Sequence, residues 1–138
     1  MSVPRVLGLN HVTLAVSDLG RATAFYRDVL GCVLRAEWPE GVYLEAGPVW
    51  LCLSVDPKVR TEPHPDYTHV AFDVDDATFE ALEPLVRAQA KLWKENRSAG
   101  RSLYFLDPDG HKLELHVGSL ATRLKAYRDR AAPDMIFY

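Results

Sequence analysis

Residues 10–18, Asn-His-Val-Thr-Leu-Ala-Val-Ser-Asp, and residues 68–76, Thr-His-Val-Ala-Phe-Asp-Val-Asp-Asp, decide the fold because they are two copies of one motif. In each copy a histidine is followed directly by a valine, and an aspartate closes the segment. Polar and apolar residues alternate through both copies, which is typical of a strand with one face against a core. Apolar residues at helical spacing then follow over residues 19–30 and 77–89. The chain is therefore predicted to contain a duplicated strand–helix unit.

Further strands are expected after each helix. They cover residues 33–38, 42–45 and 49–55 in the first half, and residues 91–94, 102–106 and 112–117 in the second. Residues 107–110, Asp-Pro-Asp-Gly, predict a tight turn between the last two strands. Pro84 predicts a kink or a division of the second helix, because proline lacks the N–H that a helix interior uses. A C-terminal helix is expected over residues 120–130.

Each half therefore has the order β-α-β-β-β, and the fold class is α+β. One such module cannot bury its own sheet face, so two modules should pair, within one chain or by exchange between two chains. We expect a single domain over residues 1–138, with module one at about 7–56, module two at about 66–118, and a helix and tail over 119–138.

His11, His69 and Glu114 are the residues with the clearest functional pattern. Each lies in an alternating segment, on the face opposite the apolar residues. A lone strand histidine is usually structural, but two imidazoles and one carboxylate form a divalent-metal set with open positions for water or substrate. His116 shares the face of Glu114, where a structural role is expected. Cys52 takes the place in the first half that Glu114 takes in the second, so it should face the same cavity.

Composition excludes several classes of protein. At 138 residues, with 48% apolar and 25% charged residues, the chain suits one globular domain with a core of its own. A formal net charge of −3 without a basic block argues against a nucleic-acid partner. No apolar run reaches the length of a membrane span and no signal peptide is evident, so a cytoplasmic location is expected. Cys32 and Cys52 should then be free thiols.

An ordered set of motifs resembles the vicinal-oxygen-chelate superfamily, and within it the fosfomycin-resistance thiol transferases. The segments that carry the resemblance are residues 9–16, 49–54, 66–69, 94–100 and 102–111, continued through Glu114 to Gly118 and Arg123. The resemblance covers nearly the whole chain. It implies paired βαβββ modules that form a cupped mixed sheet with helices outside.

The resemblance also implies an activity and a site. His11, His69 and Glu114 would bind manganese(II), His11 coming from one subunit of a homodimer with exchanged modules and the other two from its partner. The metal would polarise the epoxide oxygen of fosfomycin while a thiolate, usually that of glutathione, opens the ring. The positions that match phosphonate binding are Lys94, Ser98, Ser102, Tyr104 and Arg123. Those that match the pocket wall are Thr13, Tyr43, Trp50, Cys52 and Tyr67. The expected catalytic residues are Thr13, Tyr43, Lys94 and Arg123, with Tyr43 a candidate base for the thiol.

Potassium and the thiol are the points at which the chain departs from the glutathione-using pattern. The resemblance places a potassium ion in the loop of Asn96, Ser98, Gly100 and Ser102. Ala99 and Arg101 stand where acidic residues are typical, which should weaken potassium binding. The tail at residues 135–138 is more similar to relatives that use bacillithiol or cysteine, whereas the loop and residues 50–52 favour glutathione.

Three other functions remain open. The first is epoxide hydrolysis, because Glu40 stands near the carboxylate base of the hydrolase subgroup. The second is a non-catalytic antibiotic-binding protein of the same fold, against which the triad of His11, His69 and Glu114 argues. The third is iron-dependent ring cleavage, which uses a similar triad but usually a longer, two-domain chain.

Overall fold

The structure is a computed structural model that describes residues 3–138, and the chain forms two compact units, one ending at Glu62 and the other running from Pro63 to Tyr138. The first unit contains β1 (His11–Val16), α1 (Leu19–Ala24), the π-helical η1 (Phe25–Val29), β2 (Val33–Trp38), β3 (Gly41–Ala46) and β4 (Val49–Val55). The second contains β5 (Val70–Asp73), α2 (Asp76–Gln89), β6 (Leu92–Lys94), β7 (Arg101–Leu106), β8 (Lys112–Val117) and α3 (Leu120–Asp129). Each unit is described by itself below.

The two sheets share one topology. Their strand orders are β1-β4-β3-β2 and β5-β8-β7-β6, so the first strand of each unit is an edge strand. That edge strand is parallel to its neighbour, and the other pairs are antiparallel. Each unit is therefore a βαβββ module with a mixed sheet, as the sequence predicts.

The first unit buries its core between the sheet and the helical segment. Val16, Tyr26, Leu51 and Leu53 are fully buried there. Asp18 caps α1, since its carboxylate accepts the Arg21 N–H at 3.0 Å. The helix then widens into η1, where the Leu30 N–H reaches the Phe25 carbonyl five residues back at 3.2 Å. The predicted helix over residues 19–30 is thus present, with an unforeseen π-helical second half.

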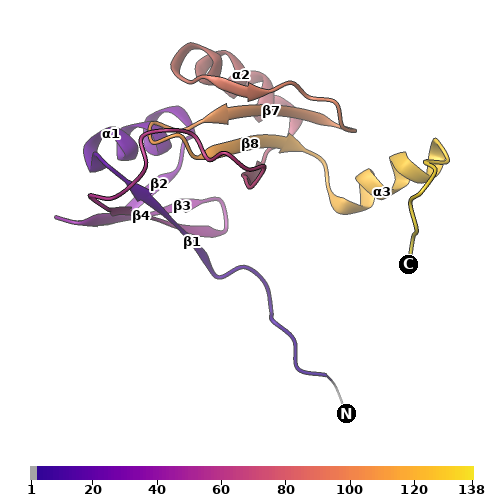
Figure 1. The fold of residues 1–138 in the computed structure, drawn as a ribbon, viewed down its shortest axis with the longest axis horizontal. Helices are drawn as coiled ribbons and strands as arrows, with labels where there is room; N and C mark the ends of the chain where they lie inside the picture. The colour runs from indigo at the N-terminus through magenta and orange to yellow at the C-terminus, as the bar shows by residue number, and fades with distance from the viewer. Residues whose placement is uncertain (1–2) are drawn as a thin grey trace. The chain divides into compact units, whose positions relative to one another are not determined.

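The second unit packs α2 over its sheet (Figure 1), with Val86, Phe105 and Leu113 fully buried. Asp75 caps the helix by accepting the Thr78 N–H at 2.7 Å. The helix runs through Pro84 without interruption, so the predicted division is wrong. Packing of the apolar residues on both sides of Pro84 offsets the one missing backbone hydrogen bond.

The ends of β5 and β8 place the candidate site. Only part of the alternating motif at residues 68–76 forms a strand, because β5 runs from Val70 to Asp73 and leaves His69 just before it. Asp66 accepts the Thr68 N–H at 3.0 Å, and this local turn holds the backbone out of the strand. After β8, Ser119 and Thr122 form a capping box that starts α3. The turn at residues 107–110 is confirmed, with the Asp107 carboxylate accepting the N–H groups of Asp109 and His111 at 2.9 Å.

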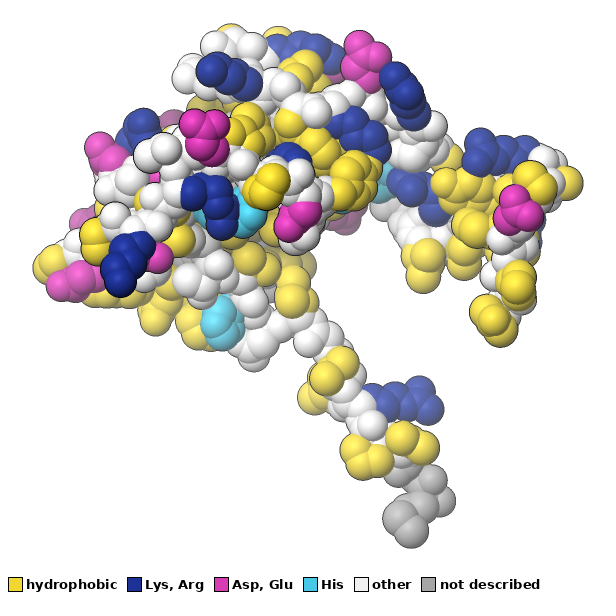
Figure 2. Space-filling model, viewed as in Figure 1, with side chains coloured by type: hydrophobic (Ala, Val, Ile, Leu, Met, Phe, Trp, Pro, Cys, Tyr) yellow, Lys and Arg dark blue, Asp and Glu magenta, His cyan; other side chains and the backbone are white. Residues whose placement is uncertain are grey.

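Hydrophobic side chains are exposed along the segment before β1 (Figure 2), where Val6 is 93% and Leu7 105% exposed. No helix among residues 3–138 combines the length and the apolar character that crossing a bilayer requires. The α+β class and the repeated module agree with the sequence analysis, whereas exchange of modules between subunits stays a prediction.

Candidate metal and anion site

The second unit brings His69 and Glu114 into contact. Glu114 lies on β8 and is only 5% exposed, and β8 pairs with β5 directly after His69. The two side chains meet with His69 Nε2 and Glu114 Oε1 3.0 Å apart. A buried carboxylate requires a positively charged or hydrogen-bonding partner, so the contact needs a physical explanation.

The hydrogen bonds of His69 determine how this side chain can pair with the buried Glu114 carboxylate. His69 Nδ1 lies 2.8 Å from the Tyr67 carbonyl oxygen, which can only accept, so Nδ1 carries the hydrogen. In the neutral ring Nε2 then presents a lone pair to a carboxylate oxygen that also presents a lone pair. Two acceptors at this distance need a cation between or beside them, either a proton or a metal ion. The pair therefore fits a divalent metal, and the Nδ1 bond to a carbonyl is the usual support of a metal-binding histidine.

His11 has the same arrangement in the first unit. Its Nδ1 lies 2.7 Å from the side-chain oxygen of Asn10, which leaves Nε2 free to bind a ligand. The ring stacks on Trp50 with centroids 4.2 Å apart. No cluster of three or more His, Cys, Asp or Glu side chains suited to a metal ion occurs among residues 3–138. The structure thus pairs two of the three predicted ligands, and the complete triad stays a prediction.

Aromatic rings and one lysine surround His69. Lys94 on β6 hydrogen-bonds the Tyr67 hydroxyl, and its Nζ lies 4.7 Å from the ring centroids of both Tyr67 and Tyr104. The bond to Tyr67 raises the pKa of Lys94 above its usual value and so favours the cation. Trp93 packs against all three rings, with centroids 5.4 Å from His69, 5.7 Å from Tyr67 and 5.2 Å from Tyr104. The sequence analysis missed Trp93, although its place beside Lys94 was a usable signal.

The second carboxylate oxygen of Glu114 is connected to Arg123 through the side chains of Ser102 and His116. Ser102 Oγ lies 2.7 Å from Glu114 Oε2 and 2.6 Å from His116 Nδ1. Arg123 on α3 places one terminal nitrogen, Nη2, 3.4 Å from both Ser98 Oγ and His116 Nε2. The Nε of Arg123 is buried and has no partner among the described residues. The structure therefore gathers the predicted Ser98, Ser102 and Arg123 in the second unit.

The loop between β6 and β7 is organised by Asn96. Its side-chain N–H group donates to the Gly100 carbonyl at 2.9 Å, and its oxygen accepts from the backbone and hydroxyl of Ser98, both at 3.1 Å. Arg101 forms ion pairs with Asp76 and Glu80 on α2, at 3.3 and 3.4 Å. The positive charge of Arg101, which is absent from the typical potassium loop, is thus partly neutralised by the two carboxylates of α2. The potassium site stays a prediction.

The predicted residues of the first unit share one sheet region. Cys52 on β4 is opposite Thr13 on β1 and opposite Tyr43 on β3. The Tyr43 ring makes edge contacts with Trp50 at 5.2 Å and with Trp38 at 4.7 Å. Tyr43 and Trp50 are 37% and 40% exposed, so this face presents aromatic surface beside His11. Trp38 joins this cluster, and the sequence analysis had not singled it out.

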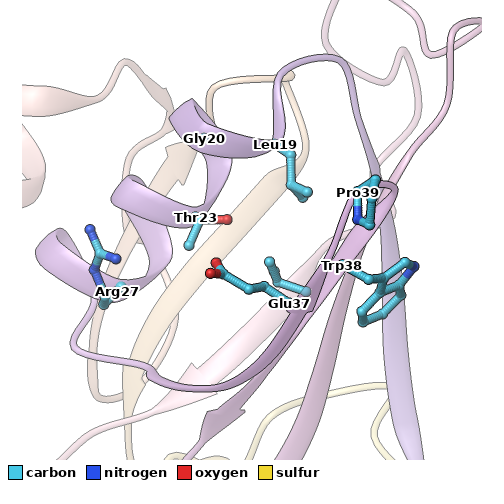
Figure 3. A pocket seen from close by; sticks show the side chains of 8 residues that line it. Leu19, Gly20, Thr23, Arg27, Glu37, Trp38 and Pro39 are labelled. Carbon is cyan, nitrogen blue, oxygen red and sulfur yellow. The ribbon is translucent and has the colours of Figure 1, made fainter.

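A separate pocket of the first unit contains none of the predicted site residues. It has a volume of about 550 Å³ and opens beside α1 and the β2–β3 hairpin (Figure 3). The lining residues are Leu19, Gly20, Thr23, Arg27, Glu37, Trp38, Pro39 and Val42. The Thr23 hydroxyl is buried and has no partner among the described residues.

Known proteins with similar sequences and structures identify the family. The family described as the Glyoxalase/Bleomycin resistance protein/Dioxygenase superfamily matches residues 8–115. "Glutathione transferase FosA" of Serratia marcescens is 52% identical over 132 residues, which are 94% of each chain. "Metallothiol transferase FosB" of Staphylococcus epidermidis is 38% identical over 138 residues, covering 96% of this chain and 99% of the relative.

Solved structures agree. The fosfomycin resistance protein FosX of Listeria monocytogenes in its monoclinic form at pH 6.5 is 28% identical, with a TM-score of 0.76 over 89% of this chain and all of FosX. A mutant of that protein, complexed with Mn(II) and 1S,2S-dihydroxypropylphosphonic acid, also has a TM-score of 0.76, at 26% identity over 87% of this chain and 99% of the mutant. The chain therefore belongs to the Glyoxalase/Bleomycin resistance protein/Dioxygenase superfamily.

Proposed function

We propose that this protein is a fosfomycin-resistance enzyme, a metal-dependent transferase that adds glutathione to the epoxide ring of the drug. The observation that carries the proposal is the meeting of His69 Nε2 and Glu114 Oε1 at 3.0 Å beside Lys94 and the hydroxyl of Tyr67. This arrangement combines a place for a divalent cation with donors for an anionic group. The similarity to the FosA, FosB and FosX proteins supports the substrate class.

Three side chains would hold the metal: His69 and Glu114 of one subunit and His11 of a second subunit. Manganese(II) is the proposed ion. Bound there, a divalent ion supplies a Lewis acid for the charge that develops on the epoxide oxygen. Glu114 provides negative charge, and Ser102 fixes the orientation of its second oxygen through the 2.7 Å hydrogen bond.

The phosphonate would be held by the cations and hydroxyls of the second unit. Lys94 supplies charge near Tyr67 and Tyr104, and Arg123 can bind two oxygens of one anion with its planar donors. Ser98, in the loop before β7, would donate a neutral hydrogen bond if its hydroxyl turned from Asn96 to the anion. Because these groups lie on both sides of Glu114, a bound anion would be fixed relative to the metal, and such positioning lowers the barrier for attack.

Glutathione is the proposed thiol because the FosA relative is the most similar of the curated proteins described above. Thr13, Tyr43, Trp50 and Cys52 form the proposed wall of the substrate pocket. Potassium is proposed as an activating ion at Asn96, Ser98, Gly100 and Ser102.

A homodimer with exchanged modules is proposed for the complete site. The edge strand β1 carries His11, and the edge strand β5 begins directly after His69. Pairing β1 of one subunit with β5 of another would satisfy both open edges and bring the histidines toward one metal.

The test follows fosfomycin by phosphorus NMR with protein and manganese(II). Parallel samples contain no thiol, glutathione, cysteine or bacillithiol, each with and without potassium. A new adduct signal with glutathione alone is expected, and an adduct with another thiol would move the protein to that subgroup. A diol in the thiol-free sample would indicate hydrolysis, for which Glu40 in the β2–β3 turn is the candidate base. An unchanged drug signal in every sample, with manganese bound, would refute the proposed function.

A further inference from the structure

His116 stands between the two charged groups of the site. Its Nδ1 lies 2.6 Å from Ser102 Oγ, which in turn lies 2.7 Å from Glu114 Oε2. Its Nε2 lies 3.4 Å from Arg123 Nη2. One continuous series of contacts thus runs from the guanidinium on α3 to the carboxylate on β8. Neither the family match nor the names of the relatives assign a role to this histidine.

The donor and acceptor chemistry gives the series one direction. A guanidinium can only donate, so Arg123 donates to Nε2 of His116. An ionised carboxylate can only accept, so Ser102 donates its single hydroxyl hydrogen to Glu114. The Ser102 oxygen must then accept from Nδ1 of His116. All three bonds form together only when the ring is neutral and carries its hydrogen on Nδ1.

The surroundings of the ring hold it in this position. Its side chain is 17% exposed, against 7% for Glu114. A Cβ atom on Gly100 would lie 3.1 Å from Cε1 of the ring, and one on Gly118 would lie 3.1 Å from Nε2. Both glycines have positive φ angles, of 89° and 135°. Glycine at both positions therefore leaves the room that the imidazole ring occupies.

We propose that His116 is a positioning residue that aligns Arg123 with Glu114 and so couples anion binding to metal binding. This inference rests on the proposed function for the identity of the metal and the phosphonate. Hydrogen bonds in such a series polarise one another, so ordering one end favours order at the other. Coupling between two ligands is reciprocal: a phosphonate held by Arg123 should tighten the metal site, and the metal should tighten phosphonate binding by the same factor.

Two amide substitutions separate the two halves of the series. In His116→Asn the amide nitrogen takes the place of Nδ1, which keeps the bond to Ser102 and loses the one to Arg123. In His116→Gln the amide takes the place of Nε2, which keeps the bond to Arg123 and loses the one to Ser102. His116→Leu loses both. His111→Asn is the matched control, since His111 lies at the β7–β8 turn, outside the series.

The experiment measures manganese(II) affinity by electron paramagnetic resonance, with and without methylphosphonate, together with kcat and KM for fosfomycin. We expect the Asn variant to keep manganese affinity and raise KM, and the Gln variant to keep KM and lose manganese affinity, each by about tenfold, the usual effect of a residue behind a metal ligand. The Leu variant should lose both. Because each of the three substitutions interrupts the series, all three should lose the effect of methylphosphonate on manganese binding. A general loss of folding would not give this crossed pattern.

Nitrogen NMR of the metal-free wild type provides a second measurement. It should report the hydrogen of His116 on Nδ1, and a hydrogen on Nε2 would overturn the inference. Equal changes in the Asn and Gln variants, or none, would also overturn it. Failure of the proposed function looks different: the wild type itself would then bind no manganese or leave fosfomycin unchanged, while the tautomer could still be measured.

Discussion

Replacing Glu114 by glutamine should stabilise the metal-free protein while abolishing metal binding. In the wild type, Glu114 Oε1 and His69 Nε2 face each other at 3.0 Å with no hydrogen between them when the ring is neutral. A glutamine amide at the same place donates to His69, and its oxygen still accepts from Ser102. The substitution Glu114→Gln thus turns an unfavourable contact into a hydrogen bond without changing the shape of the side chain.

The magnitude follows from the burial of the group. At 5% exposure Glu114 has little access to water, and pairing a buried polar group that was unsatisfied is worth about 1–3 kcal/mol. For a chain of 138 residues this corresponds to roughly 3–5 °C in Tm for each kcal/mol. Manganese at about a thousand times its Kd should stabilise the wild type by about 4.1 kcal/mol, which exceeds the gain from the amide, and the variant not at all. The order of stability should therefore reverse when manganese is added.

The assay is thermal unfolding at pH 8 with EDTA or with manganese(II). Glu62→Gln, at an exposed position, is the matched control and should leave both Tm values unchanged. A metal-free Glu114→Gln protein that is less stable than the wild type would refute the reasoning. Such a result would mean that the carboxylate and His69 attract each other without a metal.

Three further predictions concern other parts of the chain. His11→Ala and Glu114→Ala subunits should each be inactive alone. A mixed dimer of the two should regain about half of the wild-type activity per dimer, because exchange of modules leaves one site with all three side chains. A fully inactive mixture would contradict the exchange. Lys94→Met should raise KM for fosfomycin by about tenfold or more, since it removes a charge-assisted bond. The bond to Tyr67 raises the pKa of Lys94, so the wild-type KM should stay constant up to pH 9. An increase in KM below pH 9 would count against this role of Lys94. Burial raises the pKa of Cys32 to about 11, so its thiolate is scarce at pH 8 and an alkylating reagent followed by mass spectrometry should label it only after unfolding; rapid labelling of the native protein would contradict this.

The repeat could be predicted from the sequence because alternation and helical spacing are local properties. The histidine of each copy and the turn at residues 107–110 both act through neighbours within a few positions. The repeat pairs Asp18 with Asp76, whereas the structure uses Asp18 and Asp75 as the helix caps. The π-helical form of η1 could not be predicted in this way, because the spacing of apolar residues does not distinguish hydrogen bonds to the residue four positions back from those to the residue five positions back. The late start of β5 depends on the Asp66 side chain, which competes with strand geometry.

The site was predictable only in part. Glu114 follows from its strand position, and His69 from the motif that repeats His11, although His69 lies just before β5. The resemblance supplied Lys94, Ser102 and Arg123. The place of His116 on the face of Glu114 was predicted, but its contact with Arg123 was not, because that contact depends on how α3 carries Arg123 back to the end of β8. Trp93 was missed for the same kind of reason, since its Nε1 hydrogen bond to the Leu113 carbonyl at 3.1 Å joins residues far apart in sequence.

The shared strand register of the two modules has a consequence for how such a site could arise. Thr13 faces Cys52 across β1 and β4, and in the same register Ala71 faces Glu114 across β5 and β8. Duplication of a module copies the scaffold position but not the need for the same side chain there. One copy could keep an acidic ligand while the other acquired a small thiol at the corresponding place. The difference between a thiol on β4 and a carboxylate on β8 thus lies at a single position on a common backbone, where substitution changes the chemistry of the side chain.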